Sequence, residues 1–394
     1  MASARRTSSD SSDRDDQPPK RLKSGAVRGT MQLHEHARES SDHDANDDDA
    51  REDEIDSGED CSQEDMLLSE VHIHPGNGRV DGRLISSTFR LSKTARPGVN
   101  NVSDATVVVA KTIEATLKPD GENDVHSDES DDPWDYYIDI QHTMGSTLRG
   151  VGSQVWMGSF LMTDYLVSLG DKIEGAIAIE LGAGTGIASI AAGLLSPIAK
   201  IFCTDFDTAV LENCQSNIVQ SCSTYPCAES STLLSLEKRV LPKRLNWLAH
   251  DPFDCSLTEE IDPFSWTLDE IEEWKQNGAF IFASDVVYDD SLTDALIGCL
   301  EKLLTISLPK DHPRHEEGRV AYISMEKRYN FSLNELDIVA QAHDYFVKKM
   351  GLSKVLKACT IDKASIDSYC DYSRTEDLVL FEVTCRELLD LTKG

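Results

Sequence analysis

The sequence predicts an α/β fold, with a mostly parallel, twisted sheet of seven strands and helices on both of its faces. Two patterns predict it. Short apolar segments rich in β-branched residues alternate with segments in which apolar residues recur every three or four positions. One apolar segment, 177–181, also runs directly into a glycine-rich turn and then a helical segment, which is how a nucleotide-type α/β unit begins.

Residues 1–66 predict a disordered acidic tail. The segment is rich in Ser, Asp, Glu and Arg and has almost no aromatic or β-branched residues, so it cannot bury enough apolar surface to offset the entropy lost on ordering. It also contains the basic cluster Lys20, Arg21 and Lys23, which follows two prolines as in a nuclear localisation signal. We therefore expect the protein in the nucleus and the cytoplasm.

The next two segments predict an accessory part and a linker. Alternation of apolar and polar residues predicts strands at 67–75 and 82–93, and a third at 106–118, so residues 67–118 form an accessory β segment. The acid-rich stretch at 119–135 predicts a linker. Residues 136–394 are then the main domain.

The main domain predicts strands and helices in alternation. An amphipathic helix is expected from Trp156 onward, because apolar residues there recur at helical spacing. Strands are expected at 177–181, 199–207, 238–247, 278–288 and 319–328, and helices at 187–195, 208–219, 291–306 and 332–350. Two closing strands, 353–361 and 377–385, follow one another without a helical crossover.

The glycine-rich turn leaves two ligand classes open. Its glycines, at 182, 184 and 186, have GxGxG spacing, whereas a nicotinamide dinucleotide site favours GxGxxG. Asp205 stands at the expected end of the second strand, where an acid suits ribose hydroxyls in either class of ligand. The spacing, and Glu180 just before the first glycine, favour S-adenosylmethionine, which carries no phosphate.

Five segments together resemble the class I, seven-β-strand lysine methyltransferase family, which includes the methyltransferase-like proteins. They are VWMGSFLMTDYL, IELGAGTGIASI, CTDFDTAVLENCQSNI, LNW and ASDVVYDD, and the resemblance covers residues 151–327. It implies S-adenosylmethionine as cofactor, contacted by Trp156, Glu180, Gly182, Gly184, Asp205, Trp247 and Ser284. Asn246 departs from the family pattern, which has an acid before this tryptophan, and the segments 221–232 and 252–276 are longer than in many members.

The resemblance also implies the reaction, which is methyl transfer to a lysine amine of a protein. Asp285 and Tyr288 match the family's DxxY motif, and we expect Asp285 to orient the amine and Tyr288 to wall its channel. No separate nucleophile and no metal are needed. A catalytically weak methyltransferase fold that serves as a protein-interaction module is the alternative, and another acceptor, such as histidine or a small molecule, is a further one.

Composition limits the partners. The net charge of −32 argues against binding to nucleic acid, because neutralising phosphates needs clustered Lys and Arg, and it favours a basic protein substrate. Asp285-Val-Val-Tyr288 also lacks the [DNS]PP[YFW] segment typical of methyltransferases that act on adenine or glutamine. The ten cysteines show no zinc spacing, and no apolar run is long enough for a membrane span. We expect a monomer with free thiols.

Overall fold

The computed structural model describes residues 67–68, 84–96, 134–224, 235–253, 262–332 and 337–386. The chain separates into two units, Met1–Cys61 and Ser62–Gly394, and the described residues all belong to the second. The predicted acidic tail with its basic cluster, the strand at 106–118 and most of the linker lie outside the described residues, so the predicted domain bounds stay a prediction.

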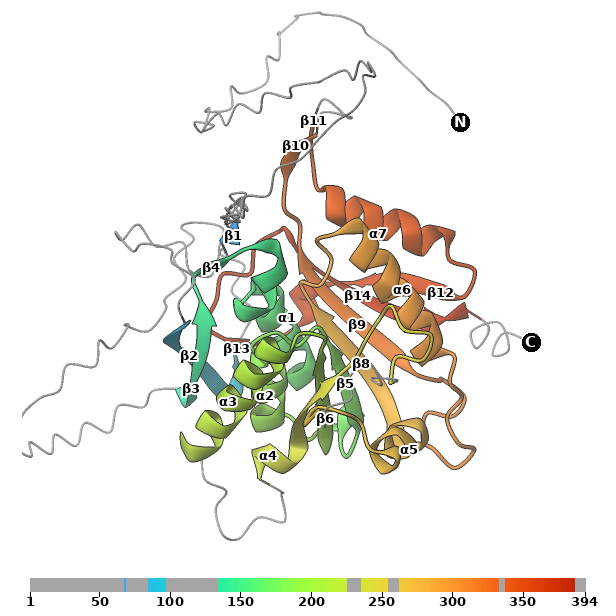
Figure 1. The fold of residues 1–394 in the computed structure, drawn as a ribbon, viewed down its shortest axis with the longest axis horizontal. Helices are drawn as coiled ribbons and strands as arrows, with labels where there is room; N and C mark the ends of the chain where they lie inside the picture. The colour runs from blue at the N-terminus through green and yellow to red at the C-terminus, as the bar shows by residue number, and fades with distance from the viewer. Residues whose placement is uncertain are drawn as a thin grey trace, which may run out of the picture. The chain divides into compact units, whose positions relative to one another are not determined.

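A seven-stranded sheet forms the centre of the fold (Figure 1). Its spatial order is β12-β14-β9-β8-β5-β6-β7, and every strand is parallel to the others except β14, which runs antiparallel to both neighbours. The prediction of a seven-stranded, mostly parallel sheet whose last two strands pair directly is therefore confirmed. The strands are β5 Ile177–Leu181, β6 Lys200–Asp205, β7 Val240–Arg244, β8 Gly278–Ser284, β9 Val320–Glu326, β12 Leu356–Ile361 and β14 Leu378–Cys385.

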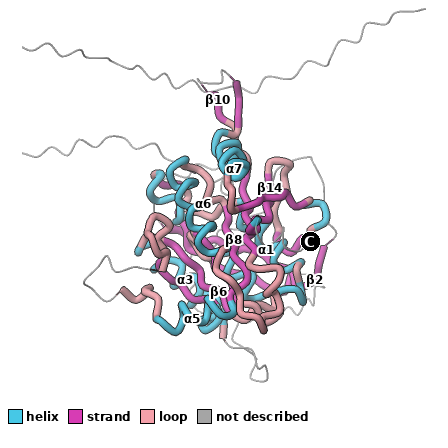
Figure 2. The backbone as a smooth tube through the Cα atoms, turned by 90° about the vertical axis from the view of Figure 1, so that its right-hand side faces the viewer, coloured by secondary structure: helices cyan, strands magenta, loops and turns pink. Residues whose placement is uncertain are grey.

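Helices cover both faces of this sheet, which is why its central strands β5 and β8 are buried along their whole length. One face packs against α1, α2 and α3, and the other against α5, α6 and α7 (Figures 1 and 2). The helices are α1 Met157–Ser168, α2 Ile187–Leu195, α3 Thr208–Thr224, α4 Leu236–Arg239, α5 Leu268–Asn277, α6 Asp290–Leu304 and α7 Gln341–Leu352. α3 thus extends into the longer segment 221–232, and α5 begins within the longer segment 252–276.

The prediction that α1 is amphipathic is wrong, because nine of its twelve residues are buried. A second sheet covers the side of α1 that would otherwise face solvent. This sheet has the order β13-β2-β3, with β2 Leu84–Arg96, β3 Trp134–Thr143 and β13 Ser368–Cys370. Phe89 of β2 packs on Phe160 of α1 with their ring centroids 5.5 Å apart. The helix is therefore sandwiched between two sheets, and its apolar residues need no single stripe.

A buried carboxylate fixes α1 to the second sheet. Asp164 is fully buried, and its Oδ1 accepts hydrogen bonds from the backbone N–H groups of Tyr369 (2.7 Å) and Cys370 (2.9 Å). Its Oδ2 forms an ion pair with Arg374 at 2.6 Å. Burial raises the pKa of Asp164, and the arginine and the two N–H groups oppose that rise. These contacts hold the connection between β12 and β14 across the helix.

The helix predicted at 332–350 begins nine residues late. The segment starts instead with a β-hairpin of β10 Asn330–Ser332 and β11 Asp337–Val339, and α7 follows. The β-branched pair Ile338 and Val339 favours an extended backbone, and tertiary context decides over the helical spacing of the apolar residues. The hairpin projects beyond the end of α7 (Figures 1 and 2).

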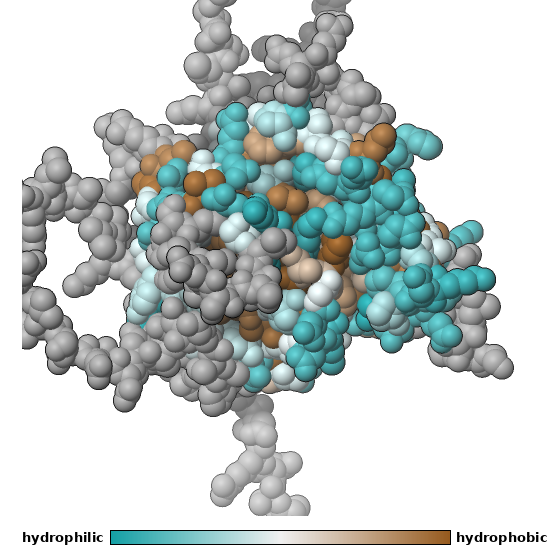
Figure 3. Space-filling model, turned by 90° about the horizontal axis from the view of Figure 1, so that it is seen from below, coloured by the Kyte–Doolittle hydropathy of each residue, from teal (hydrophilic) through white to brown (hydrophobic). Residues whose placement is uncertain are grey.

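Five short elements complete the described part of the chain. They are β1 Leu67–Leu68, which pairs with β4 Gly145–Ser146, and the 3₁₀ helices η2 Leu148–Ser153, η3 Gly170–Ile173 and η4 Lys363–Ser365. No helix within these ranges has the length and apolar composition needed to cross a bilayer. On the face seen in Figure 3, the visible described residues show hydrophobic groups as separate patches among hydrophilic ones.

Candidate active site

The glycine-rich turn joins β5 to α2 and exposes bare backbone. Gly182, Gly184 and Gly186 all have positive φ, at 68°, 56° and 80°, a region that side chains rarely adopt. A Cβ on Gly184 would lie 2.8 Å from the carbonyl oxygen of Gly152 in η2, and one on Gly182 would lie 2.6 Å from Val286 Cγ1. Both the dihedral angles and the close neighbours therefore require glycine.

Asp205 lies at the carboxyl end of β6, beside this turn. Its Oδ2 accepts a hydrogen bond from the Gly184 N–H (3.2 Å), and its Oδ1 accepts from the N–H of Phe206 (2.7 Å). Burial raises the pKa of Asp205, and these backbone donors oppose the rise. The carboxylate is thus fixed at the sheet edge where open α/β sheets bind their ligands.

Trp247 follows β7 and reaches the same turn. Two atoms of its ring lie 3.5 Å from the position that a Cβ on Gly182 would take. The preceding Asn246, which replaces the expected acid, accepts a hydrogen bond from the Leu248 N–H at 3.0 Å. The amide side chain therefore shapes the turn that presents the tryptophan.

Glu180 and Ser284 lie beneath the turn rather than on its surface. The Glu180 carboxyl is buried and accepts a hydrogen bond from Ser189 Oγ, and burial raises its pKa to about 8. Ser284 ends β8 one residue after the pair formed by Ala283 and Leu181, so it lies beside Gly182. Its buried Oγ has no hydrogen-bond partner in the described part of the chain.

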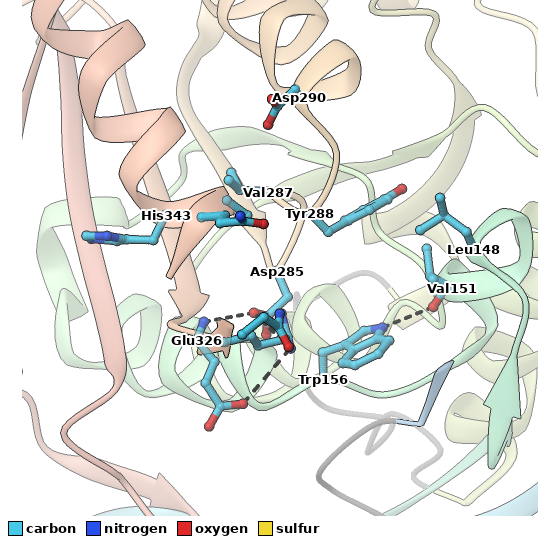
Figure 4. Close-up of a pocket in the computed structure, with 13 residues that line it drawn as sticks. Leu148, Val151, Trp156, Asp285, Val287, Tyr288, Asp290, Glu326 and His343 are labelled. Carbon is cyan, nitrogen blue, oxygen red and sulfur yellow. Dashed lines mark hydrogen bonds and ion pairs between the residues drawn. The ribbon is translucent and has the colours of Figure 1, made fainter. Parts of the chain in front are cut away.

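A pocket of about 320 Å³ opens next to the turn (Figure 4). Its wall combines η2, the start of α1, the β8–α6 connection, the end of β9 and the start of α7. Trp156 and Tyr288 supply its aromatic surface, and Asp285 lies between Trp156 and Glu326 in Figure 4. Val286, which contacts the glycine turn, precedes the lining residue Val287, so the turn and the pocket share a wall.

Two contacts hold the indole ring of Trp156, one at its N–H group and one at its face. Its Nε1 donates a hydrogen bond to the Val151 carbonyl oxygen at 3.0 Å, and the Arg328 guanidinium lies 4.7 Å from the ring centroid. Such a cation over an indole face is an attractive contact. The aromatic wall is therefore already able to hold a cation next to the pocket.

Asp285 is buried, and backbone groups surround it. Its Oδ2 accepts from the Gly158 N–H at 2.5 Å, and its Oδ1 from the Glu326 N–H at 2.9 Å. Arg328 Nη2 lies 3.5 Å from Oδ1. Asp285 is also the non-glycine residue with positive φ (54°) among those described.

Tyr288 lies at the pocket's edge and is 38% exposed. Partial burial, with the nearby carboxylates of Asp205 and Asp289, raises its pKa to about 12. The phenol therefore stays neutral at physiological pH. Tyr288 is therefore close enough to the acid at the glycine turn for the two groups to interact electrostatically.

Comparison with known proteins shows which family the chain belongs to. A family model described as lysine methyltransferase matches residues 137–309. Over 299 residues the chain is 30% identical to human methyltransferase-like protein 22, an alignment that covers 74% of this chain and 69% of that protein. The chain belongs to the lysine methyltransferase family. This confirms the family that the five sequence segments indicated.

Two further similarities have lower sequence identity. Mouse protein N-lysine methyltransferase METTL21A is 26% identical, over 51% of this chain and 78% of that protein. Among solved structures, the Streptomyces achromogenes O-methyltransferase TomG in complex with SAM gives a TM-score of 0.30 at 12% identity, covering 57% of this chain and 78% of that one. Family membership rests on the sequence matches.

The lysine methyltransferase residues expected from sequence fall into two adjacent groups. Gly182, Gly184, Asp205 and Trp247 meet at the glycine turn, with Glu180 and Ser284 beneath it, and Trp156, Asp285 and Tyr288 line the pocket. The sequence assigned no role to Arg328, Glu326 or His343, which also line the pocket. Glu326 is the last residue of the apolar strand β9 and Arg328 follows it by two residues, at the edge where active sites of parallel sheets form, and that position was a signal for them.

Proposed function

We propose that the chain is an S-adenosylmethionine-dependent protein-lysine N-methyltransferase. The observation that carries this proposal is the aromatic pocket walled by Trp156 and Tyr288, which shares a wall with the glycine turn and Asp205. A pocket with aromatic walls suits an aliphatic side chain that ends in an amine. Membership of the lysine methyltransferase family supports the same acceptor.

The residues around the turn fit the methyl donor. The bare backbone at Gly182 and Gly184 allows close approach, and Asp205 can accept hydrogen bonds from ribose hydroxyls. Trp247 offers a flat surface for adenine, and the Ser284 hydroxyl is a buried polar group without a partner among the described residues. When bound, the donor supplies an electrophilic methyl group on a sulfonium centre.

The pocket then has to deliver a neutral amine. A free lysine has a pKa of about 10.4, so deprotonating it at pH 7 requires about 4.6 kcal/mol unless its surroundings lower that pKa. The rings of Trp156 and Tyr288 remove water from the amine, and desolvation favours the neutral form. Tyr288, itself neutral, can exchange a hydrogen bond with the amine without adding a charge.

Chain neighbours of the pocket residues support a basic protein segment as the substrate. Tyr329 is 51% exposed and directly precedes the lining residue Asn330, with which β10 begins. Ile338 of β11 is 64% exposed and directly precedes Val339, which pairs with Asn330. Asp290 at the pocket and Asp344 beside it are exposed acids. Exposed apolar groups flanked by carboxylates suit a peptide that carries both apolar and basic residues around its lysine.

The test is methyl transfer into a lysate from cells that lack this protein. Purified full-length chain and tritium-labelled S-adenosylmethionine should label a protein band, and mass spectrometry of that band should find methyllysine. Asp205→Ala should abolish labelling, whereas the exposed α5 acid variant Asp269→Asn should leave it unchanged. Labelling confined to histidine, or to small molecules, would reject the proposal. Heat stabilisation by S-adenosylhomocysteine without any labelling would favour the interaction-module alternative.

A further inference from the structure

The Asp285 carboxylate is occupied by the protein's own backbone. Its side chain has no exposed surface, and each of its oxygens accepts a hydrogen bond from a different element, α1 and β9. A lysine amine would have to compete with these donors and reach a fully buried group. Asp285 thus differs from a catalytic carboxylate whose oxygens are open to a substrate amine.

The bond to α1 supplies a helix cap from outside the helix. Trp156 is the N-cap residue of α1, and its own side chain makes no capping hydrogen bond. The Gly158 N–H is one of the first-turn donors that lack a partner within a helix, and Asp285 Oδ2 accepts from it at 2.5 Å. Because the helix N-terminus carries partial positive charge, a carboxylate is a favourable acceptor there.

The three residues around this cap fit one another closely. A Cβ on Gly158 would lie 2.4 Å from Asp285 Oδ2 and 3.3 Å from the Ser324 carbonyl oxygen. Ser324 also accepts from the Asp285 N–H at 2.8 Å and donates its Oγ–H to the Gly158 carbonyl oxygen at 2.7 Å. Gly158, Asp285 and Ser324 thus form a joint between α1 and β9. This joint requires glycine at 158 and the left-handed backbone of Asp285.

The same carboxylate also reaches the pocket wall. Arg328 lies 3.5 Å from Asp285 Oδ1 and 4.7 Å from the ring centroid of Trp156, which itself begins α1. Moving the carboxylate would shift both the start of α1 and the cation that covers the indole. Trp156 and Arg328 thus depend on Asp285 through separate contacts.

We propose that Asp285 is a positioning residue that ties the start of α1 to the end of β9 and so places Trp156 and Arg328 on the acceptor pocket, without touching the acceptor amine. This rests on the proposed function, because the pocket is the one assigned to the acceptor lysine. It also gives Gly158 and Ser324 roles, since both belong to the same joint.

Two variants break the joint from opposite sides. Asp285→Asn introduces a residue type that tolerates the left-handed backbone. It removes the negative charge and replaces one acceptor oxygen by an NH2 group, which would face a backbone N–H donor. Gly158→Ala keeps the carboxylate and displaces it. Each should raise the acceptor KM and the dissociation constant for S-adenosylhomocysteine by roughly tenfold, and the double variant should be no worse than either single variant. The pH profile of kcat should keep its shape.

Direct contact with the amine predicts a different pattern. Asp285→Asn would then lower kcat by roughly a hundredfold or more with little change in cofactor affinity, and Gly158→Ala, which displaces the carboxylate, would likewise lower kcat and leave cofactor affinity near wild type. That result would overturn the proposal. Gly298→Ala, a helix glycine with open space around its Cβ position, is the matched control for the glycine substitution.

A measurement independent of activity separates this inference from the proposed function. Amide hydrogen exchange in the first turn of α1 should be at least roughly tenfold faster in Asp285→Asn than in wild type, with α6 unchanged. Ser324→Ala, which removes one hydrogen bond of the joint, should give a smaller change in the same direction if Asp285→Asn fails to fold. Unchanged exchange in either folded variant would reject the joint. Absence of lysine methylation by wild type would reject only the proposed function.

Discussion

The backbone N–H of Gly184 donates a 3.2 Å hydrogen bond to Asp205, and this bond joins the glycine turn of the first central strand to the acid of its neighbour. Asp205→Ala removes the acceptor for that N–H and the group expected to bind ribose. Hydrogen bonds to charged groups contribute about 1.5–3 kcal/mol. We therefore expect S-adenosylhomocysteine to bind roughly 10- to 150-fold more weakly, as measured by calorimetry. An unchanged affinity would exclude Asp205 from the cofactor site.

Gly184→Ala and Gly298→Ala should have opposite effects on stability. At Gly184 the φ is +56° and the new Cβ would lie 2.8 Å from a backbone oxygen, so we expect a loss of at least about 1–2 kcal/mol and weaker cofactor binding. At Gly298, inside α6, the Cβ meets open space, and replacing a helix glycine by alanine should stabilise by about 0.5–1 kcal/mol. Urea unfolding of both variants checks the pair. Equal effects of the same sign would contradict the strain at Gly184.

Glu180 should make the domain less stable as pH rises. Burial raises its pKa from 4.5 to about 8, so between these values the folded state holds a proton that the unfolded state has released. Its contribution to stability is complete below about pH 4.5 and is lost as pH rises toward 8. Glu180→Gln, which stays neutral, should match wild type at pH 5 and be more stable by up to about 5 kcal/mol at pH 9. Denaturant unfolding at both pH values measures the difference, and parallel pH curves would contradict a neutral Glu180.

Tyr288 should act through its ring more than through its hydroxyl. Tyr288→Phe keeps the aromatic wall and removes one hydrogen bond, so kcat/KM should fall by less than roughly tenfold. Tyr288→Ala removes the aromatic wall, and kcat/KM should fall about tenfold further than in Tyr288→Phe. Because the pKa of this phenol is about 12, wild type and Tyr288→Phe should have the same pH profile between pH 6 and 10. A limb of the profile that vanishes in Tyr288→Phe would show instead that the hydroxyl titrates.

The strands of the central sheet and the glycine turn were predictable because their signals are local. Apolar segments such as 278–284 are continuous since the strand is buried on both faces, and a GxGxG turn needs glycine wherever it occurs. The role of the Asp285 carboxylate was not predictable in the same way. Its donors, Gly158 and Glu326, lie 127 and 41 residues away, and no spacing in the sequence connects them.

The character of α1 and of the segment before α7 was missed for a related reason. The helix pattern at Trp156 is real, but the buried environment comes from β2 and β13, which approach from distant parts of the chain. At 337–339 the apolar spacing of a helix is present, and the hairpin forms because Asn330 and Val339 pair across it. Tertiary contacts override local preference in both places.

The anchoring of Asp164 has a consequence for how this chain is made. Its partners Tyr369, Cys370 and Arg374 follow it by 205 to 210 residues, so a ribosome must synthesise almost the whole domain before this carboxylate can be paired. Until then α1 carries a charge that its final site would bury without a partner. Completion of the core therefore comes late in synthesis, and a chain that stops before Arg374 should be a substrate for quality-control proteases.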